Sequence, residues 1–328
     1  MDLTQFHYDL PEASIAQAPL EDRAGARMLV LDRKEQCWAD GAFRDFPEFL
    51  GPGDCLVLND SKVIPSRLFG TRVGFTGVVE VLLLQPVSED GKTWTALVHP
   101  GRKMRTRERV AFEGVEAEII GRGAYGERLL HFDYHGDLLE LLQRIGHVPL
   151  PPYIRREDTA QDRERYQTVY AREAGSAAAP TAGLHFTGEI LERCHGAGAE
   201  ISYVTLHVGL GTFQPVREDH IHSERFHVSQ ENAAKIRAAR RVICAGTTSV
   251  RAVESWYLGK SGETDLFIRP GFEFQRTNAM LTNFHLPESS LLMLVCAFAG
   301  RELVLRAYEH AVRAGYRFYS YGDCMLIL

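Results

Sequence analysis

The stretch "RLFGTRVGFTGVVEVLLLQPV" (residues 67–87) contains two β-rich runs that are separated by glycines and show no helical period. Three similar runs follow, "KTWTALVHP", "ERVAFEGVEAEIIG" and "ERLLHFDYH", with glycine or charged turns between them. About five or six strands at this spacing are typical of a small barrel or sandwich. We therefore expect a β-rich unit between about Arg67 and Tyr134.

The sequence on either side of this unit has a different pattern of predicted secondary structure. Before it, "RMLVLD" (27–32) and "GDCLVLND" (53–60) predict buried strands, and after the helix in "DLLELLQRIG" (137–146) strands alternate with helices. Thr187, Ser229 and Ser289 are expected helix N-caps. "YRFYSY" (316–321) predicts a late strand. The fold class predicted is α/β: a discontinuous α/β main domain, residues 1–60 plus 150–328, with an inserted small β-barrel domain at 61–149.

Composition narrows the class of protein. The 328 residues carry a net charge of -6, with 45% hydrophobic and 24% charged residues, which is typical of a globular protein. No apolar run approaches the roughly 20 residues of a membrane span. "MDLTQFHYDLPEAS" lacks the features of a signal peptide, so we expect a cytoplasmic location. The six cysteines are scattered without a C-x-x-C pair, which argues against zinc and disulfides.

Two segments are candidates for ligand contact after strands. "AGTTSVR" (245–251) joins a strand to a helix start, so hydroxyls of Thr247 and Thr248, first-turn amides and Arg251 can hold an anion. A well-capped helix with an exposed Arg251 explains it equally well. "HVGLGTF" (207–213) carries a bare G-x-G, which indicates either a backbone turn or close approach of the main chain to a flat ligand.

Two further segments carry histidine. "TNFHLPESS" (282–290) has Asn283 and His285 on either side of Phe284, which suits a purine or nucleoside, while the alternative is a buried loop with a hydrogen-bonded histidine. "SAAAPTAGLHFT" (176–187) places His185 among apolar residues, which by itself favours a core histidine over a pocket wall. "DHIHSERFH" (219–227) has the composition of a metal site, but we interpret it as a surface or ligand-contacting loop.

Two basic segments and the C-terminus complete the candidates. "GRKMRTRER" (101–109) carries five Lys or Arg against one Glu, so a basic patch is expected on an acidic protein. "DRERYQTVYAR" (162–172) suits phosphate contact with base stacking, or is a solvated amphipathic segment. Near the C-terminus, Asp323 is a general base or, more commonly, a turn former.

In their order and wording these segments resemble one family, the S-adenosylmethionine:tRNA ribosyltransferase-isomerases of queuosine biosynthesis. "ARRV" (239–242) replaces a longer glycine-containing turn, a departure confined to a surface turn. The resemblance implies an α/β domain interrupted by a small β-barrel. It rests on "YDLPEASIAQAPLEDR", "GDCLVLNDSKVIPSRLFG", "VPLPPYIRR", "DRERYQTVYA", "APTAGLHFT", "VTLHVGLGTFQPV", "HSERFHV", "GTTSVRAVES", "TNFHLPESSLLMLVCAFAG" and "YRFYSYGDCMLIL".

The resemblance also implies a reaction. The ribosyl moiety of S-adenosylmethionine is transferred to 7-aminomethyl-7-deazaguanine at the tRNA wobble position and isomerised, giving epoxyqueuosine with release of adenine and methionine. S-adenosylmethionine is then a consumed co-substrate, tRNA is the partner and no metal is required. We expect a monomer. The chemistry needs a base beside the sulfonium, a hydrogen bond to the departing adenine and stabilisation of oxyanions.

We assign roles on this basis. His185 is the predicted general acid or base, with Asp323 its nearest rival; as a general catalyst, His185 replaced by Gln should lose ~10²-fold or more in turnover. Thr247, Thr248 and Arg251 are assigned to the methionine carboxylate or a tRNA phosphate, and Asn283, Phe284 and His285 to adenine or the modified base. The other predicted substrate contacts are Thr181, Gly183, His207, Gly209 and Gly211, and the predicted tRNA contacts are Arg102, Lys103, Arg105, Arg107, Arg165 and Tyr166.

Two other functions are weighed against this one. A conventional adenosylmethionine-dependent RNA methyltransferase would leave adenosylhomocysteine, but no Gly-rich first motif with a following acidic residue is present. A non-catalytic RNA-binding protein would use the β-rich domain to dock nucleic acid. The small products distinguish all three.

Overall fold

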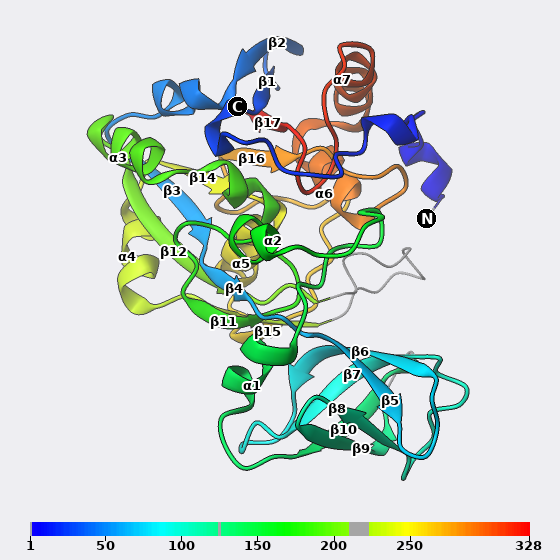
Figure 1. The fold of residues 1–328 in the computed structure, drawn as a ribbon. Coiled ribbons are helices and arrows are strands. Elements are labelled where there is room, and N and C mark those ends of the chain that lie inside the picture. Colours follow the sequence, from blue (N-terminus) through cyan, green and yellow to red (C-terminus); the bar gives the residue numbers. More distant parts are fainter. Residues whose placement is uncertain (1, 124–125, 210–222) are drawn as a thin grey trace.

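The computed structural model describes residues 2–123, 126–209 and 223–328. Figure 1 shows an α/β body that contains both ends of the chain and a separate barrel at one end of the molecule. The predicted fold class, α/β with an inserted barrel, is confirmed. Among the described residues, no helix is both long and apolar enough to cross a membrane.

The described residues of the α/β body form a nine-stranded sheet. Neighbours from β12 through β16 run parallel, whereas β17 runs antiparallel to β16. The carboxyl ends of these parallel strands therefore meet the start of β17 at one edge, where ligands bind in open α/β sheets. In spatial order the strands are β15 (Gly262–Thr264), β13 (Glu224–His227), β12 (Glu200–Leu206), β3 (Asp54–Asn59), β14 (Arg241–Ala245), β16 (Ala279–Asn283), β17 (Cys324–Ile327), β1 (Arg27–Asp32) and β2 (Cys37–Ala42).

Both faces of the sheet are covered, and this explains the continuous apolar runs. All six residues of β3 are buried: Cys55 and Val57 pack on the face that carries α5, α6 and α7, and Leu56 and Leu58 pack on the face that carries α3. The described helices are α1 (Leu138–Ile145), α2 (Ala160–Arg165), α3 (Gly188–Gly196), α4 (Gln230–Ala238), α5 (Thr247–Tyr257), α6 (Ser290–Ala299) and α7 (Arg301–Arg313).

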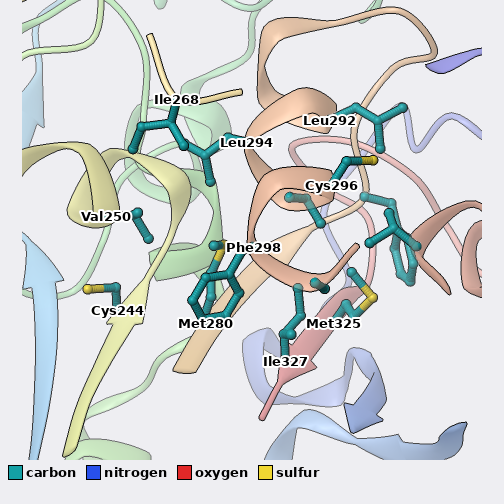
Figure 2. Close-up of a cluster of buried hydrophobic side chains, with 14 of the residues drawn as sticks. Cys244, Val250, Ile268, Met280, Leu292, Leu294, Cys296, Phe298, Met325 and Ile327 are labelled. Atoms are coloured by element: carbon teal, nitrogen blue, oxygen red, sulfur yellow. The ribbon is translucent and has the colours of Figure 1, made fainter. Parts of the chain in front are cut away.

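Helix α6 is the most apolar of these helices. It is buried against the sheet and packs beside α5 and α7. Figure 2 shows Cys296 and Phe298 of α6 near Met280 of β16 and Met325 of β17. Burying a side chain of this size stabilises the fold by about 1.5–3 kcal/mol. This packing supports the strands whose ends carry the candidate site.

The predicted N-caps are confirmed. Thr187 accepts a hydrogen bond from the Ile190 amide at 3.2 Å, opening α3. Ser229 and Ser289 cap α4 and α6 by the same contact, from residues three positions later. Short polar side chains before an apolar helix are therefore a reliable guide to helix starts in this chain.

The inserted unit is a closed barrel rather than a sandwich. In β6, Val79, Val81 and Leu83 point inward and are buried, with less buried residues between them, as a strand period of two requires. Leu141 and Leu142 of α1 pack into the same core. The barrel order is β10 (Arg128–Asp133), β7 (Thr93–His99), β6 (Val78–Pro86), β5 (Arg67–Arg72), β8 (Arg109–Phe112) and β9 (Val115–Arg122).

The connection into the barrel belongs partly to the α/β body. Strand β4 (Ser61–Val63) pairs in parallel with β11 (Glu173–Ser176), outside the barrel. The barrel strands themselves lie between Arg67 and Asp133. The domain limits at residues 60 and 150 stay a prediction.

The strand predicted over residues 316–321 is wrong. Phe318 makes only an isolated bridge to Ile15, and the last strand is β17, at Cys324–Ile327. The aromatic residues of "YRFYSY" are spaced in part as in a strand, but they are present for packing. The Phe318 ring centroid lies 4.9 Å from that of Phe284 and 6.1 Å from that of Tyr308. Tertiary packing of aromatic rings therefore produced a strand-like pattern where the chain makes a turn.

Candidate functional site

A cavity of about 490 Å³ opens at the carboxyl edge of the sheet. Its wall is made by the segment after β14, the segment after β16, the turn before β17 and residues 179–182. Ligand cavities have volumes of roughly 300–1,000 Å³ and a few convergent polar groups in an apolar lining. Here the polar side chains on the wall include Thr181, Thr247, Thr248, Asn283, His285 and Tyr319.

The first turn of α5 forms one side of this cavity. Gly246, at φ +94°, allows the sharp turn from β14, and no side chain caps the helix. Thr247 and Thr248 line the cavity, and Thr248 Oγ1 is buried without a partner among the described residues. Free first-turn amides beside an unpaired hydroxyl suit a negatively charged ligand group.

Arg251 lies elsewhere, although it belongs to the same helix. Arg251 is 7% exposed, and its guanidinium forms a buried ion pair with Glu224 and donates to the carbonyl of Leu266 at 3.2 Å. Glu224 in turn accepts the amide of Gly209 at 2.8 Å. Arg251 is therefore neither the exposed residue of the capped-helix alternative nor a residue of the cavity wall.

Asn283 and His285 line the cavity at the end of β16, and their contact with adenine or the modified base stays a prediction. Burial lowers the pKa of His285 to about 3, so the ring is neutral near pH 7, and its Nε2 lies 2.8 Å from Thr282 Oγ1. Phe284 is fully buried in an aromatic cluster, with its ring centroid 5.1 Å from that of Tyr308. Phe284 is also one of the residues that line the cavity.

His185 lies behind Asn283, in a 3₁₀ turn at Thr181–His185, and is not one of the cavity-lining residues. Its Nε2 lies 3.2 Å from Asn283 Oδ1, and its ring centroid lies 5.2 Å from that of Phe43. Burial lowers the pKa of His185 to about 4. The imidazole is therefore neutral at pH 7, and its predicted acid–base role stays a prediction.

Asp323 is a buried anchor for two backbone segments. Its carboxylate oxygens accept the amides of Arg27, at 2.9 Å, and Arg317, at 2.8 Å. Burial raises its pKa, and the residue lies off the cavity wall. These hydrogen bonds join two segments of the chain and do not close a local turn at Asp323, and its role as a base also stays a prediction.

The predicted substrate contacts in the two glycine-containing segments do not all line the cavity. Thr181 lines the cavity, but a Cβ on Gly183 would lie 2.3 Å from Tyr170 Oη, so tight packing explains this glycine. His207 is partly buried, and burial lowers its pKa to about 4. Its Nδ1 has no partner among the described residues. Gly211 lies outside the described residues.

The candidate metal segment at 219–227 lies partly outside the described residues. In the described ranges, no group of three or more His, Cys, Asp or Glu side chains is arranged to hold a metal ion.

The predicted RNA contacts fall into two groups. Arg102, Lys103, Arg105 and Arg107 are exposed on the loop between β7 and β8. In contrast, Tyr166 is 1% exposed. Arg165 donates to the carbonyls of Leu20 and Glu21, at 2.5 and 3.0 Å. Of the predicted RNA contacts that the structure describes, those on the barrel loop present exposed cationic side chains to a large partner.

The buried side chain of Arg128 anchors the start of this basic loop. The guanidinium of Arg128, 9% exposed, donates to the carbonyl of Gly101 at 2.9 Å and to that of Met104 at 3.0 Å. Met104 itself is fully buried in the barrel core. The loop is therefore anchored at its start while its other side chains remain in solvent.

Sequence reasoning missed Tyr319, which lines the cavity. Its hydroxyl is buried with no partner among the described residues, and its ring centroid lies 4.2 Å from that of Tyr153. The signal was the dipeptide Gly322–Asp323, which favours a turn and argues against a strand over the tyrosines before it.

The fold and the site define an α/β protein with an inserted six-stranded barrel, a ligand cavity at the carboxyl edge of its sheet and a basic loop on the barrel. The family model described as "Queuosine biosynthesis protein" matches residues 3–327. The chain is 59% identical to an S-adenosylmethionine:tRNA ribosyltransferase-isomerase of Solibacter usitatus and 49% identical to one of Symbiobacterium thermophilum, each over 100% of both chains.

A solved structure, that of the S-adenosylmethionine tRNA ribosyltransferase from Thermotoga maritima, is 38% identical, with a TM-score of 0.57 over 99% of this chain and 100% of that one. The chain belongs to the S-adenosylmethionine:tRNA ribosyltransferase-isomerase family of queuosine biosynthesis, and the predicted family and enzyme class, a transferase, are confirmed.

Proposed function

We propose that this chain transfers and isomerises the ribosyl moiety of S-adenosylmethionine onto 7-aminomethyl-7-deazaguanine at the wobble position of a tRNA. The products are epoxyqueuosine in the tRNA, free adenine and free methionine. The full-length match to relatives that carry this enzyme name is the observation that carries the proposal. The cavity of about 490 Å³ supports it, because it has room for a ligand of this kind.

The polar groups of the cavity suit S-adenosylmethionine as a consumed co-substrate. The uncapped first turn of α5 and the unpaired Thr248 hydroxyl offer donors for the methionine carboxylate. Asn283 and the neutral His285 offer hydrogen bonds to a purine ring on the adjoining wall. Arg251 is left out of the proposed site because Glu224 holds its guanidinium.

The reaction balances without an oxidant or reductant. The bonds from the ribosyl group to adenine and to sulfur break, and a C–O bond of its furanose ring opens. A bond to the aminomethyl nitrogen forms, together with the carbon–carbon bond that closes the cyclopentane and the C–O bond that closes the epoxide. A proton must leave a carbon beside the sulfonium, and the departing adenine must gain one. His185 and Asp323, the acid–base residues predicted from the sequence, both lie behind the wall and are left out of the proposed site.

The exposed cations of the barrel loop are the proposed tRNA contact. Arg102, Lys103, Arg105 and Arg107 can neutralise phosphates, which makes affinity depend on salt. Arg165 and Tyr166 are left out, because backbone carbonyls hold the first and burial hides the second. The cytoplasmic location and the monomeric state stay predictions.

One assay tests the proposal. The protein is incubated with S-adenosylmethionine and a tRNA that carries the aminomethyl base, and the small products are separated by chromatography. Adenine and methionine in equal amounts support ribosyl transfer. Adenosylhomocysteine would indicate a methyltransferase, and the absence of turnover with retained tRNA binding would indicate a binding protein. The same tRNA with an unmodified guanine is the control and should release no adenine.

A further inference from the structure

Tyr319 has an unusual backbone conformation at the cavity. Its φ is +75°, in the left-handed region that a bulky side chain avoids, and such residues persist only where their surroundings hold them. The Tyr319 amide donates to the carbonyl of Phe284 at 3.2 Å. Its carbonyl accepts from the amide of Gly322 at 2.9 Å and from the side chain of Asn283 at 2.8 Å.

The conformation places a phenol on the cavity wall. Tyr319 is 8% exposed and lines the cavity, and its hydroxyl has no partner among the described residues. The ring rests against Tyr153, whose hydroxyl is within 2.5 Å of Ser320 Oγ. A buried hydroxyl without a partner is costly, so a polar atom of a ligand is its expected partner.

Asn283 connects this turn to His185 and fixes the tautomer of the imidazole. The Asn283 side-chain nitrogen must face the Tyr319 carbonyl, because a carbonyl only accepts. Asn283 Oδ1 therefore faces His185, and Nε2 of His185, 3.2 Å away, must carry the hydrogen. The charged groups that act on the imidazole are Arg23 and Arg317, both cations, which disfavour its protonation.

We infer that His185 is a positioning residue: its Nε2–H holds Asn283, and through that amide it keeps Tyr319 in the conformation that presents the phenol to a purine-like ring in the cavity. The inference rests on the proposed function for the identity of that ring, which is either the adenine of S-adenosylmethionine or the modified base of the tRNA. In this role the imidazole moves no proton.

A pair of variants separates positioning from proton transfer. His185→Gln keeps an N–H donor close to the position of Nε2 but cannot titrate near neutrality, whereas His185→Phe keeps a ring and loses the donor. Positioning predicts that the Gln variant retains kcat within about threefold and the pH profile of the parent. It predicts that the Phe variant loses about tenfold in kcat/KM, as Tyr319→Phe should, because the phenol contact is misplaced. A Gln variant as inactive as the Phe variant, or one that lacks a limb of the pH profile, overturns the inference.

Tyr319→Phe then identifies the ligand. Loss of the hydroxyl should raise KM about tenfold for S-adenosylmethionine if the phenol contacts adenine, or for tRNA if it contacts the modified base. In the double variant with His185→Phe, the effects should be markedly less than additive, because both changes remove one contact. Full additivity would place His185 and Tyr319 in separate roles and would overturn the inference.

Two further measurements distinguish a failure of this inference from misfolding of a variant and from a failure of the proposed function. If His185→Phe fails to fold, as judged by thermal unfolding, the activity and pH profile of His185→Gln still decide between the two roles. If the parent protein releases no adenine, the proposed function falls by itself. Binding of S-adenosylmethionine and of the tRNA, each alone by equilibrium dialysis, then tests the inference: for at least one ligand, Tyr319→Phe and His185→Phe should weaken binding alike and His185→Gln should not. Equal binding of both ligands by all variants would contradict it.

Discussion

The cavity wall and the basic loop of the barrel differ in burial, in charge and in the kind of ligand contact that they can make. On the wall, Asn283 and His285 are buried, uncharged at pH 7 and held by hydrogen bonds to neighbours on either side. On the loop, Arg105 and Arg107 are exposed and charged. A fixed set of dipoles in a dry site suits chemistry, whereas exposed cations suit attraction to a polyanion at long range. The two regions should therefore fail in different ways when mutated.

The largest effect is expected from Asn283→Ala. The change removes the donor to the Tyr319 carbonyl and the acceptor for His185. The strained turn at Tyr319 therefore loses one of the hydrogen bonds that keep its conformation. We expect kcat for adenine release to fall about 10²–10³-fold, with little change in tRNA affinity. Steady-state kinetics with both substrates and a tRNA-binding titration measure the two quantities.

A matched control lies near the opposite end of the same strand. Asn278 accepts the amide of Val242 at 2.8 Å just before β16 begins, far along the strand from the cavity. Asn278→Ala should keep kcat within about threefold, even though it also removes a backbone contact. Similar losses in both variants would mean that general stability, not the geometry of the wall, explains the result.

The second effect is a pH dependence of stability confined to the buried region. The pKa of His185 is about 4 in the folded chain and about 6.5 unfolded, so the unfolded state binds more protons between these values. Stability is therefore retained above about pH 6.5 and falls as the pH drops towards about 4. For this one group the loss between pH 7 and pH 5 is about 2 kcal/mol.

Urea unfolding at the two pH values measures this loss. His185→Gln should reduce the difference between pH 7 and pH 5 by about that amount, whereas the variant Arg105→Ala with Arg107→Ala should leave it unchanged. An unaltered pH dependence in the Gln variant would mean that the imidazole has the same pKa in the folded and the unfolded chain, as an exposed ring would.

The smallest effect is expected from the barrel loop. Arg105→Ala with Arg107→Ala should weaken tRNA binding about tenfold at low salt and reduce the slope of log affinity against log salt by about 2. At saturating tRNA the rate of adenine release should be that of the parent. Unchanged affinity at low and at moderate salt would remove the loop from the tRNA contact.

The sequence predicted the parts of the fold that depend on local chemistry. Apolar runs between glycines predicted the barrel strands, and Thr187, Ser229 and Ser289 predicted three helix starts. Each of these signals comes from residues within a few positions of one another. The cavity residues Asn283 and His285 were found for the same reason, because they flank Phe284 within one short segment.

What the sequence could not predict depends on distant partners. Arg251 of α5 was assigned to an anion, but its guanidinium forms an ion pair with Glu224 of β13. The turn at Tyr319 depends on Asn283, 36 positions earlier in the chain. Residue type indicates which bonds a side chain can make, and only the fold determines which partner it meets.

The most direct test of the account is the single-turnover rate of adenine release, measured at low and at moderate salt with S-adenosylmethionine and the aminomethyl-base tRNA both saturating. The account predicts that Asn283→Ala slows release at both salt concentrations while Arg105→Ala with Arg107→Ala does not slow it at either. Adenine release by Asn283→Ala at the rate of the parent would contradict the claim that the chemistry takes place in the cavity at the carboxyl edge of the sheet.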